Sequence, residues 1–339
     1  IDHIAGSSMG ALVGAMYASG LSPWEIDSIF RTEQFGIMAD GGVEARYQYF
    51  FKQDYPDASL ISLRFDLDTT LQTSLPTNIR SPALLDFEQM RSFSPVSAAT
   101  GYDMDSLFVP FRCVASDLTA QRSVVFRKGD LAQAVRASMS YPFYFKPIRV
   151  DGHLMMDGGL YNNFPSDVMY EDFFPDLIVG SNVSSNSAPP NEDDLLSQLR
   201  AMMQEPTDFT VICENGVIIE PKIGTSVFDF SDPAEAITSG YKEAMARMPE
   251  ILAQVQRRIP QEELRARRKE FRSKFPPLVF GDVRVHGLGR SATRFVDQTI
   301  HPDDTTLTAD QIKGAYFRLF ADRNIALLYP KATYRPERG

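Results

Sequence analysis

Hydrophobic residues in the first 180 positions recur in short blocks whose spacing alternates between strand-like and helix-like. A strand-like opening run is followed at once by a small-residue helix over residues 11–18. An apolar run over 109–117 with a partner at 124–126 predicts a hairpin, and residues 131–139 have helical spacing. The block 177–180 is typical of a buried parallel strand. This recurrence of strand, loop and helix predicts an α/β fold with a mainly parallel sheet.

Turn and cap signals divide these blocks into elements. Asp151-Gly152 separates two strand-like runs, over 145–150 and 153–156, and is a favoured two-residue hairpin turn. Ser22-Pro23-Trp24-Glu25 has the residues of a capping box with proline in the first turn. A helical period returns over 81–94. We therefore expect a hairpin at 145–156 and new helices near residues 23 and 83.

The C-terminal half has a different pattern. Apolar residues from Tyr241 to Val255 keep helical spacing, with Pro249 expected to kink or restart the helix. A basic stretch over 257–274 predicts a solvated helix face, with an anionic membrane surface as the alternative. Beyond the prolines at 276–277, the pattern predicts a strand at 279–285, a helix at 290–299, a capped helix from Thr308, and strands near 325–328 and 332–334. We predict a large α/β domain at 1–255, a basic helical linker at 256–275, and a small α+β domain at 276–339.

Composition narrows the class of protein. The 339 residues are 43% hydrophobic and 23% charged, which is ordinary for a globular protein with a core. A net charge of −10 argues against nucleic acid as a partner. The two cysteines, Cys113 and Cys213, fit no metal-ligand spacing, and we expect no metal and no cofactor. Because the chain opens within a strand and without methionine, we expect it to be part of a longer natural chain.

The strongest chemical signal is Gly6-Ser7-Ser8-Met9-Gly10, a G-x-S-x-G pattern between a predicted strand and a predicted helix. In this setting the two glycines permit a sharp turn with Ser8 exposed at its apex. The N-terminus of the following helix directs its N–H groups at the same point, which suits an oxyanion. The alternative is a glycine-rich turn without chemistry.

A nucleophilic serine needs a base, and the four histidines are His3, His153, His286 and His301. The α/β-hydrolase order requires the histidine after the acid, and the two that follow Asp157, His286 and His301, both lie in the small terminal domain. None of the four is well placed for a Ser-His-Asp triad. An aspartate is the remaining candidate. Two Asp-Gly-Gly sites compete, one at Asp40 in a polar loop and one at Asp157 after a strand.

The motifs together resemble the patatin-like phospholipases, a family with a G-x-S-x-G elbow and a later D-G-G/A motif followed by an N-x-P segment. The matching pieces are Gly6–Gly10, Asp157-Gly158-Gly159, Asn163 to Pro165, and the blocks at 110–117 and 135–142. The resemblance covers residues 1 to about 200 and implies a three-layer α/β sandwich. It also implies that Ser8 is the nucleophile, that Asp157 is its base, and that Asp40 is a coincidence. Gly158, Gly159 and Asn163 would support them.

The reaction that the resemblance implies is hydrolysis of lipid or phospholipid esters through an acyl-enzyme. The Met9 N–H should be one oxyanion donor. Such enzymes also carry a G-G-x-[RK]-G oxyanion loop some tens of residues before the serine, and here only the strand itself precedes Ser8. We expect that loop to precede Ile1 in the natural chain and the 339 residues alone to be inactive or nearly so. The alternatives are an inactive patatin-like scaffold that binds or transports, and a serine peptidase or thioesterase.

The C-terminal 64 or so residues resemble a polypeptide-transport-associated (POTRA) domain, with the run Phe280 to Gly287, the capped helix from Thr308, and Leu327 to Pro330 as the supporting pieces. The alternative is an unrelated α/β accessory domain. Together with the first resemblance, this implies a type V secretion phospholipase of the cell envelope, with an outer-membrane β-barrel in the same full-length chain and a membrane surface as partner. The aromatic-rich stretch from Tyr47 to Tyr55 is interpreted as core, with a lipid-contacting cap as the alternative.

Overall fold

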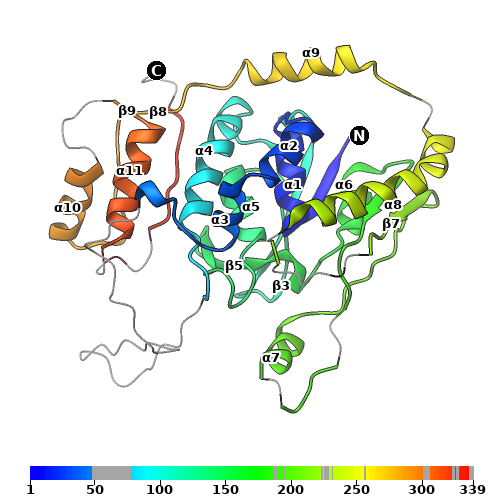
Figure 1. Ribbon diagram of the computed structural model, residues 1–339, viewed down its shortest axis with the longest axis horizontal. Helices are drawn as coiled ribbons and strands as arrows, with labels where there is room; N and C mark the ends of the chain where they lie inside the picture. Colours follow the sequence, from blue (N-terminus) through cyan, green and yellow to red (C-terminus); the bar gives the residue numbers. More distant parts are fainter. Residues whose placement is uncertain are drawn as a thin grey trace.

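The computed structural model (Figure 1) describes most of the chain. The described residues are 1–47, 78–186, 189–193, 195–222, 224, 229–230, 232–255, 257–300, 306–322, 325 and 328–335. His301 and nearly all of the aromatic-rich stretch, from Tyr49 to Tyr55, lie outside them. No helix among these residues is long and apolar enough to span a bilayer.

A five-stranded sheet organises the first half of the chain. Its strands are β1 (Ile4–Ser7), β2 (Phe111–Asp117), β3 (Arg122–Phe126), β4 (Ile148–Val150) and β5 (His153–Asp157). β1 and β2 are parallel, whereas β2–β3, β2–β5 and β4–β5 are antiparallel. The prediction of a mainly parallel sheet is therefore wrong for this sheet. The reason is local, since two short hairpins force antiparallel pairing; the hairpin turn at Asp151-Gly152 is confirmed, with positive φ at both residues.

β1 and β5 lie end to end along one edge of β2. Val114 pairs with Ser7 of β1, and the next residue, Ala115, pairs with Asp157 of β5. The same β2 residues pair with β3 on their other edge. Because β1 runs parallel and β5 antiparallel to β2, their C-terminal ends face each other. The sheet thus joins two segments that are 149 residues apart in the sequence.

Three helices, α1 (Met9–Ala18), α4 (Ala83–Ala99) and α5 (Leu131–Ser138), form the principal core with β2. Their shared cluster contains Leu12, Phe93, Phe111, Cys113 and Val135, among others. Gly14 lets α1 approach β2 closely, because a β-carbon there would lie 2.9 Å from the Phe111 ring. This cluster fixes the helix that begins immediately after Ser8.

The other elements surround this unit. They are α2 (Pro23–Phe30), α3 (Glu33–Ala39), η1 (Ala45–Tyr47), η3 (Met104–Ser106), η4 (Gly158–Leu160), α6 (Ser166–Phe173), β6 (Ile178–Ser181), α7 (Leu195–Met203), β7 (Gly216–Ile219), α8 (Pro233–Gln254) and α9 (Gln261–Arg272). The capping box at Ser22 and Glu25 is confirmed. β6 and β7 form a separate parallel pair. Pro249 lies inside α8, which continues through it instead of restarting.

The C-terminal part contains β8 (Val279–Phe280), α10 (Arg290–Ile300), β9 (Leu307–Thr308) and α11 (Ala309–Phe320). The capping box that begins α11 is confirmed, with Thr308 and Gln311 bonded reciprocally. The expected strand at 279–285 is limited to two residues that pair with β9. The expected strand at 332–334 is wrong, because these residues form no ladder. The expected strand near 325–328 includes residues 326 and 327, which lie outside the described residues.

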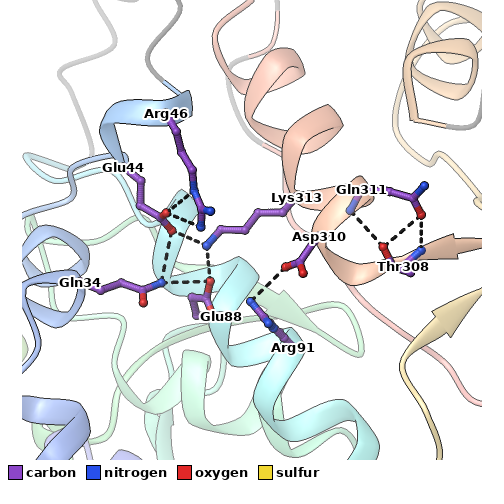
Figure 2. Close-up of polar contacts among 9 residues, drawn as sticks. All are labelled: Gln34, Glu44, Arg46, Glu88, Arg91, Thr308, Asp310, Gln311 and Lys313. Atoms are coloured by element: carbon purple, nitrogen blue, oxygen red, sulfur yellow. Dashed lines mark hydrogen bonds and ion pairs between the residues drawn. The ribbon is translucent and has the colours of Figure 1, made fainter.

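α11 packs against α4, and this contact ties the C-terminal part to the first half of the chain (Figure 1). Tyr316 and Phe317 share a buried cluster with Phe87 of α4. Lys313 is fully buried, and its ammonium pairs with Glu44 and, at 2.6 Å, with Glu88 (Figure 2). Two carboxylates thus pair with the buried Lys313 ammonium. In this structure the C-terminal part and α4 share a core.

Candidate active site

Ser8 stands between the end of β1 and the start of α1, in a strained backbone conformation. Its φ is 53° and its ψ −122°, a region that residues with a side chain seldom occupy. Gly6 makes this turn possible, because a β-carbon there would lie 2.4 Å from the Gly10 carbonyl oxygen. A β-carbon on Gly10 itself would meet no atom within 4 Å. The turn therefore requires glycine at position 6, while the expectation that Gly10 is needed for the same reason is wrong.

The structure brings the Ser8 hydroxyl and the Asp157 carboxylate together. Ser8 Oγ donates to Asp157 Oδ2 at 2.6 Å, a short bond of the kind that a charged acceptor makes. The contact follows from the sheet, since Ser8 directly follows β1 and Asp157 ends β5, and these two ends face each other along β2. A hydroxyl bonded in this way has its proton directed at a base.

Asp157 is 2% exposed, and its environment changes its basicity. Burial raises the pKa of Asp157 from 3.8 to about 6, although its bonds with Ser8 and with the Gly159 N–H act in the opposite direction. A carboxylate with a pKa near 6 is a stronger base than one in water and is still ionised at neutral pH. This combination is what general base catalysis by a carboxylate requires.

The two glycines after Asp157 fit closely around it. A β-carbon at Gly158 would lie 2.2 Å from Val114 O and 2.3 Å from Ser7 Oγ, so the chain could not pass there with any other residue. The Gly159 N–H donates to Asp157 Oδ1 at 2.8 Å, which leaves Oδ2 for Ser8. Asn163 lies beside Gly159, and its Nδ2 donates to Ser184 Oγ at 3.0 Å. Gly159 orients the carboxylate, and Asn163 connects this loop to the segment after β6.

Donors for an oxyanion are present at the start of α1. Among the residues that the structure describes, neither the Met9 nor the Gly10 N–H has a hydrogen-bond acceptor. Both belong to the first turn of the helix, where the macrodipole adds positive potential. The Ser8 N–H is not available, because it donates to Ser138 Oγ at 2.8 Å. The Met9 and Gly10 N–H groups could therefore both donate to an oxyanion at this point.

The three described histidines and Asp40 lie elsewhere. His3 stacks on Phe173 with ring centroids 4.1 Å apart. His153 Nδ1 contacts Asp117 Oδ2 at 2.7 Å, and His286 is exposed. Asp40 caps the C-terminal end of α3 and pairs with Arg80. Of the two Asp-Gly-Gly sites, the one at Asp157 is the one that contacts Ser8.

A large cavity of about 2830 Å³ opens next to Ser8 and Asp157. Its walls include both β1 and β6, and within the described residues β1 pairs only with β2 and β6 only with β7. Apolar side chains of α8 form another wall, among them Ile237, Ala244, Met248 and Ile251, and Val255 directly after the helix extends it. Residues of β1, of β6 and of an apolar face of α8 therefore line the same cavity as Ser8.

Sequence reasoning missed the residues behind the dyad, which lie at and after the end of α5. Ser138 contacts the Ser8 main chain, and Ser140 contacts the Asp157 main chain. Arg136 is 1% exposed and bonds to Asp86, Ser140 and the Lys146 carbonyl. The available signal was a lone arginine with two serines in an otherwise small and apolar helix end. In the described part of the chain no group of three metal-ligating side chains gathers in one place.

Comparison with known proteins gives a consistent match to the first half of the chain. A family model described as patatin-like phospholipase matches residues 1–170. An uncharacterized NTE family protein of Mycobacterium tuberculosis is 27% identical over 193 residues, which are 57% of this chain and 44% of that protein. Patatin-like phospholipase domain-containing protein 7 of Mus musculus and protein 6 of Homo sapiens are 29% identical over 170 and 171 residues, 50% of this chain and 10% of each relative. The matched part is less than half the length of each of these relatives.

Proposed function

Since the chain belongs to the patatin-like phospholipase family, we propose that it is the catalytic part of a lipid acyl hydrolase in which Ser8 is the nucleophile and Asp157 the general base. The observation that carries this proposal is the 2.6 Å hydrogen bond from Ser8 Oγ to a buried carboxylate at a strained elbow. The substrates would be phospholipids or other lipid esters.

The geometry supports a two-step acyl transfer. In the first step Ser8 Oγ bonds to the ester carbonyl carbon while its proton moves to Asp157 Oδ2. The carbonyl oxygen becomes an oxyanion near the Met9 and Gly10 N–H groups, and the alcohol leaves with the proton that Asp157 returns. In the second step water gives a proton to Asp157 and its oxygen attacks the acyl carbon, which releases the fatty acid and restores the Ser8 hydroxyl.

A long acyl chain fits the surroundings of the dyad better than a peptide does. The α8 wall of the cavity presents Ile237, Met248 and Ile251, with no charged side chain between them on that face. An apolar wall gains free energy from each buried methylene of a fatty acyl chain, about 0.8 kcal/mol per CH₂. This wall favours lipid esters over peptides and short thioesters.

We further propose that the full oxyanion site is completed by a segment of the longer natural chain before Ile1. Support comes from the cavity that β1 and β6 both line, because within the described residues each of these strands pairs with one neighbour only and has an edge that one more strand could pair. A loop after such a strand would reach Ser8. The 339 residues alone are then expected to hydrolyse esters far more slowly than the longer chain. A catalytically inactive scaffold would show no hydrolysis with either.

Two wider proposals concern the C-terminal part: that it is a POTRA-like module, and that the full-length protein is a cell-envelope phospholipase with an outer-membrane barrel. They rest on the sequence resemblance alone. The packing of α11 on α4 gives the first of them less support, because a transport module joined by a linker would have its own core. Limited proteolysis at residues 273–278 separates the two possibilities: an independent module would be released, while an α11 held by Lys313 would stay bound.

The direct test uses the full-length protein and its Ser8→Ala variant with three substrates: phosphatidylcholine vesicles, an acyl thioester and a peptide. We expect release of fatty acid from the vesicles by the wild type and none by the variant. Hydrolysis of the peptide or the thioester in preference to the lipid would overturn the substrate class. Equal activity of wild type and variant would overturn the role of Ser8.

A further inference from the structure

The last residue of α5 and the turn that follows it contact the main chain of both dyad residues. The Ser8 N–H donates to Ser138 Oγ at 2.8 Å, and Ser138 Oγ in turn donates to Val114 O at 2.5 Å. Two residues later, the Ser140 carbonyl accepts the Asp157 N–H at 3.0 Å. Both serines are fully buried, so water does not compete for these bonds.

The bond from Ser138 acts on the residue that is hardest to hold. Ser8 has a φ of 53°, and a backbone conformation of this kind persists only where the surroundings determine it. Ser8 lies between β1 and α1, and its N–H takes part neither in the hydrogen bonds that pair β1 with β2 nor in those within α1. Ser138 Oγ gives this N–H its acceptor, and Val114, which pairs with Ser7, anchors Ser138 to the sheet.

Arg136 of α5 also holds the turn that follows this helix. Its Nη1 donates to Ser140 Oγ at 2.5 Å and its Nη2 to the Lys146 carbonyl at 2.8 Å. Its Nε pairs with the buried carboxylate of Asp86 on α4. The guanidinium therefore ties the turn to α4 and to the segment before β4, and the Ser140 carbonyl that holds Asp157 is part of this fixed unit.

We propose that Ser138 and Ser140 are positioning residues: Ser138 through its hydroxyl sets the position of Ser8, and Ser140 through its carbonyl sets that of Asp157. The inference rests on the proposed function, since it assigns a role in the same reaction. One short turn thus fixes the distance between nucleophile and base. A displacement of about 1 Å at such a site can reduce the rate by about 10²-fold.

Ser97 provides a matched control for Ser138. It is also buried, accepts the Leu131 N–H at 3.0 Å and donates to the Phe93 carbonyl at 3.1 Å. It lies on α4, where it contacts the N-terminal end of α5, at the opposite end of that helix from Ser138. Ser138→Ala and Ser97→Ala therefore each remove one buried hydroxyl that accepts one main-chain N–H and donates to one main-chain carbonyl. A third variant, Ser138→Cys, keeps the size of the side chain and a weaker acceptor, and it serves also if Ser138→Ala does not fold.

The first measurement is the rate at which a fluorophosphonate labels Ser8 in the full-length protein, with kcat and KM for ester hydrolysis. We expect Ser138→Ala to lower kcat and the labelling rate at least tenfold with KM unchanged, Ser138→Cys to lie between it and wild type, and Ser97→Ala to keep wild-type rates despite a similar loss of thermal stability. Equal rates for Ser138→Ala and Ser97→Ala would overturn the inference.

The second measurement is amide hydrogen exchange, which does not depend on activity. In Ser138→Ala the peptide that contains Ser8 should lose protection, whereas in Ser97→Ala the peptide that contains Leu131 should. Unchanged exchange at Ser8 overturns the positioning role. If the wild type is neither labelled nor active, the proposed function fails, and exchange at Ser8 then decides by itself whether Ser138 holds the elbow.

Discussion

Replacement of Asp157 by asparagine is expected to stabilise the protein while it removes activity. Asparagine has the shape of aspartate, its Oδ1 can still accept the Gly159 N–H, and its Nδ2 can donate to Ser8 Oγ. The geometry of the site is therefore retained. The general base is lost, and such a loss typically lowers the rate by about 10²- to 10⁴-fold. We expect a decrease of this order in kcat.

The gain in stability follows from the raised pKa of Asp157. Burial raises this pKa from 3.8 to about 6, so the folded state holds its proton more tightly than the unfolded state does. As the pH rises from about 4 to 6, the unfolded chain loses this proton first, and the free energy of unfolding decreases. Above pH 6 the loss is complete, and at about 1.4 kcal/mol per pKa unit it amounts to roughly 3 kcal/mol.

Thermal unfolding of wild type and Asp157→Asn at pH 4 and pH 8 measures this effect. The difference in melting temperature, variant minus wild type, should be several degrees larger at pH 8 than at pH 4. Asp40→Asn is the control, because Asp40 follows α3 and its side chain is 66% exposed; it should give no such gain. A variant that is less stable than wild type at pH 8, or a gain that does not depend on pH, would refute the reasoning.

Other consequences of the structure can be measured separately. The dependence of kcat/KM on pH should rise with a single ionisation near pH 6 and then level off, since Asp157 must be ionised to accept the proton; a midpoint near 4 would show that burial does not tune the base. Gly6→Ala should abolish activity and lower the free energy of unfolding, because its β-carbon would lie 2.4 Å from Gly10 O. Gly10→Ala, whose β-carbon meets no atom within 4 Å, should leave the urea unfolding midpoint unchanged. Lys313→Ala should cost about 3–5 kcal/mol of unfolding free energy because it leaves Glu44 and Glu88 without their buried partner. Arg91→Ala, which breaks the exposed pair with Asp310, should cost at most about 1 kcal/mol in the same assay.

The sequence predicted the local elements of the site better than their assembly. The elbow, the Asp-Gly-Gly turn and the two capping boxes depend on residues within a few positions of each other, so their signals are local. The choice of Asp157 over Asp40 came from the resemblance and not from spacing. The contact between Ser138 and Ser8 joins residues 130 positions apart, and no pattern along the chain marks it.

The sheet and the C-terminal part show the same division. Antiparallel pairing follows from two hairpins that the sequence indicates, whereas the recurrence of strand, loop and helix predicts parallel strands. The capping box and apolar face of α11 were predicted, whereas its packing partner was not. An amphipathic pattern predicts that one face of a helix is buried, but it does not identify the element that packs on that face. In α11, Lys313 pairs with Glu44 and with Glu88 of α4, and these ion pairs determine the packing partner.

The most direct test of the Ser8–Asp157 mechanism is to trap the acyl-enzyme. The full-length protein is mixed with a slowly hydrolysed long-chain ester, quenched in acid within seconds, digested, and analysed by mass spectrometry. We predict that the peptide containing Ser8 gains the mass of the acyl group, that Ser8→Ala gains none, and that Asp157→Asn accumulates the adduct more slowly. An acyl group on another residue, or ester hydrolysis without any adduct at Ser8, would contradict the mechanism.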